Sequence, residues 1–198
     1  SIGVESDTSY DTLSGTSMAA PSVTGVIALL SEHTRDLFAR EPGAAEMRAL
    51  LVHTATRNAP DGRPDAALGW GVVDARAAAD FLTRMSSEQV SYRGMYRGDA
   101  IDLTVRPDGD EEVALTLAWL DPAGDVNEGP DDDATPALVH DLDLRVTRGG
   151  ERAFPWRMDL ADRSNPRNDG PNRVDNIERI VIPAGEGSGP VNVRIEHR

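Results

Sequence analysis

The 198-residue sequence contains no cysteine, which excludes disulfides and thiolate chemistry and leaves the redox compartment undetermined. It contains no run of about twenty apolar residues, so we expect no membrane-spanning helix. Lysine is also missing, and all 20 basic residues are arginine. We interpret this first as genome composition. A salt-tolerant or calcium-rich habitat is the second interpretation, because an acidic surface stays soluble when salt screens its self-repulsion.

Positive charge is scarce. The chain has 34 acidic and 20 basic residues, which gives a formal net charge of −14. A charge of this sign disfavours binding to nucleic acid and to anionic membranes. We therefore expect neither as a partner.

Residues 15–21 read Gly-Thr-Ser-Met-Ala-Ala-Pro and place a hydroxyl, Ser17, at the start of an apolar segment. Every residue from 18 to 30 is apolar, small or a hydroxyl, a pattern that predicts a buried helix. Free N–H groups and the positive dipole end at such a start suit a developing oxyanion. Gly15 permits a tight turn, and Pro21 is expected in the first helical turn, where its missing N–H costs little.

These seven residues resemble the active-site serine motif of the subtilisin-like serine proteases, the subtilases. The resemblance implies that Ser17 is the nucleophile and that its own N–H is one oxyanion donor. Gly15 and Thr16 then complete the oxyanion and substrate-binding segment, and catalysis requires no cofactor. The alternative is a Gly-Thr-Ser helix cap of the kind found in many proteins.

The other two members of a subtilase triad are missing from this sequence. In subtilases the order along the chain is Asp, His, Ser, so both partners are expected before Ser1. None of the four histidines has a His-Gly-Thr-His setting; two fall on helix-like segments and two flank strand-like runs, namely His33, His53, His140 and His197. We therefore expect the C-terminal part of a subtilase, inactive alone, whose partner is the upstream polypeptide that carries the catalytic Asp and His.

The sequence divides into two predicted domains. Residues 1–84 read as helices joined by loops, and residues 69–74, Gly-Trp-Gly-Val-Val-Asp, resemble the segment before the last helix of a subtilase catalytic domain. Asp74 is placed to cap the helix that follows. The fold class expected for residues 1–84 is α/β, namely the C-terminal part of a subtilisin-like domain whose parallel sheet lies mostly outside this chain.

Residues 88–198 change to a period of two, which predicts short antiparallel strands in a β-sandwich or jelly roll. The apolar alternation covers residues 101–105, 113–119, 142–146 and 191–195, with a continuous apolar run at 180–182. Segments 119–122, 137–144 and 172–178 resemble the C-terminal β-sandwich of alkaline, oxidation-tolerant extracellular bacterial subtilases. The resemblance implies a secreted protein, and a sandwich one strand short of closure at Arg198.

That branch of subtilases binds calcium in its sandwich domain, and the acidic loops of this sequence are candidate ligands. Asp141 and Asp143 lie two apart on a predicted strand and so share one face, which makes them the best candidates for a structural Ca²⁺ site. The alternative is a solvated acidic face. Further oxygens are expected from Asp121, Asp125, residues 131–133, Asp169, Asp175 and Glu178.

Two classes of function follow. The first is a serine endopeptidase that hydrolyses peptide bonds of protein substrates through an acyl-enzyme on Ser17. The second is a non-catalytic fragment whose β-sandwich acts as a stabilising or binding module. A bound upstream polypeptide that carries Asp and His distinguishes the first from the second.

Overall fold

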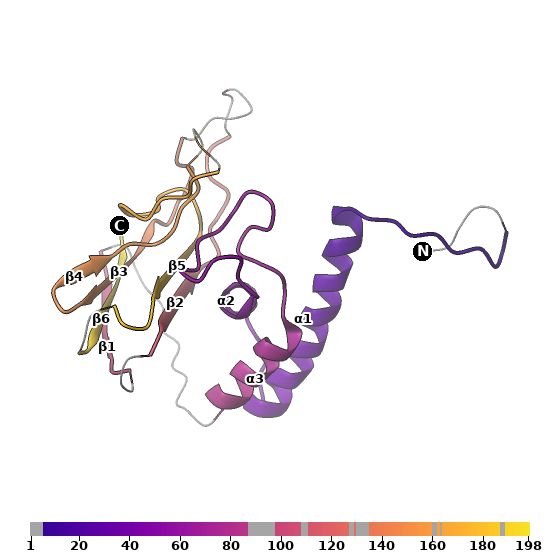
Figure 1. The fold of residues 1–198 in the computed structure, drawn as a ribbon, viewed down its shortest axis with the longest axis horizontal. Helices are drawn as coiled ribbons and strands as arrows, with labels where there is room; N and C mark the ends of the chain where they lie inside the picture. Colours follow the sequence, from indigo (N-terminus) through magenta and orange to yellow (C-terminus); the bar gives the residue numbers. More distant parts are fainter. Residues whose placement is uncertain are drawn as a thin grey trace.

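The computed structural model describes residues 6–86, 98–107, 111–126, 129, 135–159, 162, 164–186 and 189–198. Three helices come first and six strands follow (Figure 1). The helices are α1 (Thr16–Phe38), α2 (Ala44–Thr54) and α3 (Ala75–Met85). The strands are β1 (Ala100–Val105), β2 (Val113–Ala118), β3 (Leu142–Arg148), β4 (Glu151–Ala153), β5 (Ile177–Ile182) and β6 (Val191–His197).

All strand pairs among the described residues are antiparallel. One sheet has four strands in the order β1-β6-β3-β4, and the other pairs β2 with β5. The described part of residues 1–84 contributes helices but no parallel strand pair, so only the helical component of the expected α/β domain is present. The expectation of antiparallel strands after the helices is confirmed.

The two sheets enclose one apolar core. Alternate residues of a strand point to opposite faces, and the inward set of each sheet is aliphatic. β3 and β6 contribute from one sheet and β2 and β5 from the other, through Val113, Leu144, Val146, Ile180, Ile182, Val191 and Val193. This packing arises directly from the period-two pattern.

The short strand β4 is absent from the sequence-based prediction. It follows Gly149 and Gly150, whose φ angles of 59° and 89° form a tight hairpin turn after β3. A two-residue hairpin turn whose backbone twist matches that of the flanking strands requires a positive φ at both central residues. With only Glu151–Ala153 in the strand, the sequence is too short to show alternation.

Strand β5 lies between the sandwich core and the helices, and all six of its residues are buried. Ile180 and Ile182 face the sandwich core, whereas Arg179 points the other way, to the end of α2. Its guanidinium donates to the carbonyls of Val52 at 2.6 Å and His53 at 3.2 Å. A cation at a helix C-terminus satisfies free carbonyls and complements the helix dipole.

Other contacts join the two halves around Arg179. The ring of His53 lies 3.1 Å (Nδ1) from the hydroxyl of Thr116 on β2. Burial, reinforced by the charges of Arg179 and Arg57, lowers the pKa of His53 to about 4. Trp156 donates from Nε1 to the carbonyl of Asp61 at 3.0 Å. The helices and the sandwich therefore share a polar, largely buried interface.

Replacing Arg179 with methionine (Arg179→Met) tests how much Arg179 contributes to this interface. The change leaves the last carbonyls of α2 unpaired in a buried place, which costs about 2 kcal/mol of unfolding free energy. Urea unfolding monitored by circular dichroism measures the loss. Arg76→Met is the matched control, because Arg76 is exposed on α3 and its one ion pair with a described residue is with Asp80 at 3.7 Å. An equal effect of both changes contradicts the proposed role of Arg179.

Candidate functional site

Ser17 is the second residue of α1. Gly15 is the N-cap with a φ of 148°, and no side chain caps the helix. The carbonyl of Gly15 accepts from the N–H groups of Met18 at 3.0 Å and Ala19 at 3.1 Å. Within the described residues no hydrogen bond uses the Ser17 hydroxyl, which is exposed. The serine therefore presents its hydroxyl and its N–H together at the positive end of the helix.

The position of Pro21 differs from the sequence-based expectation. Because the helix begins at Thr16, Pro21 lies in the second turn rather than the first. A proline there removes the N–H that would bind the carbonyl four residues earlier. The carbonyl that lacks this partner belongs to Ser17, so the nucleophile candidate sits at a break in the helical hydrogen bonds.

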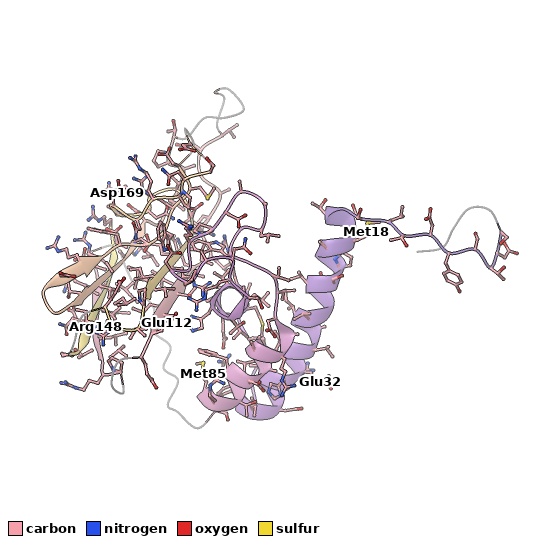
Figure 2. The ribbon with its side chains drawn as sticks, viewed as in Figure 1. Met18, Glu32, Met85, Glu112, Arg148 and Asp169 are labelled. Atoms are coloured by element: carbon pink, nitrogen blue, oxygen red, sulfur yellow. The ribbon has the colours of Figure 1, made fainter. Side chains whose placement is uncertain are left out.

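Residues 16–22 of α1 are all exposed, although the apolar sequence predicts burial. Met18 is 38% and Leu29 is 67% exposed, and Leu30, at 3%, is the first buried residue of the helix. Figure 2 shows Met18 at the free end of α1, whereas Glu32 lies at the end next to α3. None of the other described residues covers the first turns, which is the physical reason for the difference.

The structure brings no histidine to Ser17. At 1.5 Å per residue, α1 itself separates His33 from Ser17 by about 24 Å, and His33 Nε2 contacts the Thr83 hydroxyl at 3.0 Å. His53 is enclosed between α2 and β2. His140 precedes β3 and His197 ends β6, in the sandwich that lies on the far side of Figure 1 from the start of α1. None of the four histidines, all of which lie within the described residues, is therefore placed to act as a general base for Ser17.

Two of the predicted calcium ligands, Asp141 and Asp143, lie at the start of β3, and the carboxylate of Glu178 lies near them. Asp143 is 2% exposed and Glu178 is fully buried. Glu178 Oε2 accepts from the Leu144 N–H at 2.5 Å, and Asp143 Oδ2 lies 3.1 Å from Arg145 and 2.5 Å from Arg198. One buried oxygen on each of Asp141, Asp143 and Glu178 has no hydrogen-bond partner.

The charges of this carboxylate group are incompletely compensated. Burial raises the pKa of Glu178 to about 8, and the nearby charges of Asp143 and Asp141 add to the effect. Burial and then Asp143 also raise the pKa of Asp141. Glu178 is therefore mostly protonated near neutral pH when no cation compensates it. The sequence signal for this residue is one glutamate inside the otherwise mainly aliphatic β5.

The other acidic residues expected to bind metal have different partners. Asp121 accepts from the N–H groups of Val139 and His140, both at 2.8 Å. Asp175 accepts from Asn172 at 2.8 Å, and Asp169 pairs with Arg157 at 3.0 Å. Residues 131–133 lie outside the described residues. Among the described residues no three His, Cys, Asp or Glu side chains are grouped closely enough to hold an ion.

The buried Glu178 predicts a pH dependence of stability. Its pKa rises from 4.5 to about 8 on folding, so between these pH values the folded protein holds a proton that the unfolded chain has lost. The contribution of Glu178 to stability is therefore full below pH 4.5 and falls by about 3–5 kcal/mol as the pH rises to 8. The lowered pKa of His53 acts in the opposite direction between pH 6.5 and 4 and is common to the wild type and both variants. Glu178→Gln removes this difference, whereas Glu151→Gln, on exposed β4, keeps it. Urea unfolding at several pH values checks this, and equal slopes for wild type and Glu178→Gln contradict it.

Comparison with known proteins finds similarity in the first part of the chain. Residues 3–71 match the family model of the subtilases. A 72-residue alignment is 42% identical to an extracellular basic protease of Dichelobacter nodosus and covers 36% of this chain and 11% of that protein. The described helices include none that is long and apolar enough to span a membrane. Residues 3–71, which contain Ser17 and α1, are therefore similar to part of a subtilase family domain.

Proposed function

We propose that this chain is the C-terminal part of a secreted serine endopeptidase of the subtilase type, in which Ser17 forms the acyl-enzyme with a protein substrate. The observation that carries this proposal is the motif at residues 15–21, which lies within the segment that matches the subtilase family. The extracellular location of the aligned protease supports secretion.

The local geometry suits this chemistry. The Ser17 hydroxyl has no internal partner among the described residues, and its N–H stands free at the helix start, where a donor can stabilise a tetrahedral oxyanion. Gly15 is in a left-handed region with φ of 148°, and a Cβ built on it meets nothing within 4 Å. Substrate backbone can therefore approach closely along residues 15–17.

The general base and its orienting carboxylate come from the upstream polypeptide in this proposal. Such a partner also explains α1, because an exposed, almost uncharged helix segment is an interaction surface in a soluble protein. Loss of triad members lowers turnover by about 10⁴–10⁶. The isolated chain is therefore inactive.

A fluorophosphonate probe tests the nucleophile in a protein that contains the upstream segment. The expected result is one covalent adduct on Ser17, located by peptide mass spectrometry, and complete loss of labelling in Ser17→Ala. Ser22→Ala is the control, since Ser22 lies five residues further along α1, is exposed, and donates to the Met18 carbonyl at 2.9 Å. This variant keeps its labelling. An adduct on another serine, or none with the upstream segment bound, contradicts the proposal.

A non-catalytic module is the second candidate. The sandwich has its own apolar core, separate from the core of the helices, and no histidine of the chain reaches Ser17. A species that circulates without an upstream polypeptide and resists the probe supports this function instead. The same labelling experiment therefore separates the two candidates.

We further propose that Asp141 and Asp143, with Glu178, bind a structural calcium ion. Three unpartnered buried carboxylate oxygens and the raised pKa values of Asp141 and Glu178 support a cation there. Arg145 and Arg198, which already pair with Asp143, and the lack of a ready-grouped set of three ligands among the described residues oppose it. Calcium takes six to eight oxygens, so carbonyls and water complete such a site.

Thermal unfolding in calcium and in EDTA tests the metal. A ligand at one hundred times its Kd stabilises the folded state by about 2.7 kcal/mol, so calcium raises the Tm. Asp143→Asn abolishes the rise, whereas Asp80→Asn, on the exposed face of α3, preserves it. Identical melting curves in calcium and EDTA contradict the proposal.

A further inference from the structure

The outer face of the four-stranded sheet carries a groove that the functions above leave unused. Its volume is about 440 Å³. The groove crosses all four strands. Beneath it lie four residues that are partners across the sheet: Leu103 pairs with Val193, Val193 with Val146, and Val146 with Ala153. Val146 and Val193 point into the core, so their neighbours along each strand point outward and form the walls.

The two walls of the groove are polar rows that run across the strands. Asp102, Arg194 and Arg145 are paired in register along one wall. Along the other wall Thr104 pairs with Asn192, Asn192 with Thr147, and Thr147 with Arg152. Phe154 lines the groove beside β4. Hydroxyl, amide, guanidinium and aromatic groups therefore surround one elongated space.

The charge is unevenly distributed along the groove. Arg194 contacts both carboxylate oxygens of Asp102 at 2.8 Å, and Arg145 pairs with Asp143 and with Glu196. These ion pairs fix both guanidinium groups in place. Arg152, which is exposed at the β4 end, has no ion pair or hydrogen bond with any of the described residues.

We propose that this groove binds an acidic polysaccharide, a chain of sugar rings that carry carboxylates. The net charge of −14 opposes the binding of polyanions in general, so the attraction in this groove must be local. A guanidinium binds a carboxylate through two parallel hydrogen bonds, and Arg152 is the group available for this contact. Thr147 and Asn192 match sugar hydroxyls. The Phe154 ring and the methyl groups of Thr104 and Thr147 match the apolar faces of sugar rings.

The position of the groove favours a polysaccharide over an acidic peptide. Extended peptides bind sheets at a free edge, where they pair with the main chain. Here the groove crosses the sheet face, and the main-chain groups of β6 and β3 beneath it are paired with neighbouring strands on both sides. Recognition must therefore come from side chains, as it does for a ligand rich in hydroxyls and carboxylates.

The groove also lies far from the candidate nucleophile. In Figure 1 the sheet that contains β4, β3, β6 and β1 is on the opposite side of the molecule from the start of α1. A ligand there does not extend a substrate site around Ser17. The groove instead anchors the protein to an acidic polymer, and this inference holds whether or not the proposed protease function is correct.

Affinity electrophoresis in gels that contain polygalacturonate tests the proposal, with protein that carries Ser17→Ala to prevent self-cleavage. The expected result is retardation by polygalacturonate and none by the same polymer with methyl-esterified carboxyls. Arg152→Ala weakens the retardation by roughly tenfold through the loss of a bidentate contact. Arg76→Ala is the matched control and keeps wild-type binding; thermal melting verifies that both variants are folded.

Three outcomes overturn the proposal. The first is no retardation by polygalacturonate. The second is equal weakening by Arg152→Ala and Arg76→Ala, which indicates diffuse electrostatics rather than the groove. The third is equal or stronger retardation by poly-glutamate that also depends on Arg152, which identifies an acidic peptide as the ligand class.

Discussion

Arg179 and the strand that carries it are the constraint on which the rest of the structure depends. A guanidinium that is 1% exposed needs hydrogen-bond acceptors, because burying a charge without partners costs several kcal/mol. The free carbonyls at the end of α2 supply them. Burial lowers the pKa of Arg179 only to about 10, so it remains charged at neutral pH. Because α2 is fixed to β5 in this way, the helices and the sandwich pack as one unit.

The consequence for function is that the chain is well packed at one end and open at the other. Leu30, α2 and α3 share an apolar core, whereas the first turns of α1, with Ser17, extend into solvent (Figure 2). In the proposed function Ser17 lies on a helix whose first turns are not covered by the described residues, so another polypeptide completes the site. The proposed base and the cover for the helix then come from the same upstream segment.

The local features of the fold and of the candidate site could be predicted from the sequence. Features that depend on tertiary contacts could not. The motif at residues 15–21 and the alternation in β2, β3 and β6 are short-range patterns, and both are visible in the sequence. The burial of Glu178 and Arg179 is different, because β5 is covered on both faces by segments distant in sequence. The exposure of Met18 and Leu29 is also a tertiary feature, because it depends on which segments pack against α1. The groove depends on the register of four strands, which alternation alone leaves undetermined.

Hydrogen exchange of the isolated chain, followed by mass spectrometry, tests the central claim most directly. If β5 unites the two halves, α2 and β5 exchange together and slowly. Residues 16–22 then exchange much faster than residues 30–38 of the same helix, because none of the described residues covers them. Protection of residues 16–22 equal to that of residues 30–38, or separate opening of α2 and β5, contradicts the account.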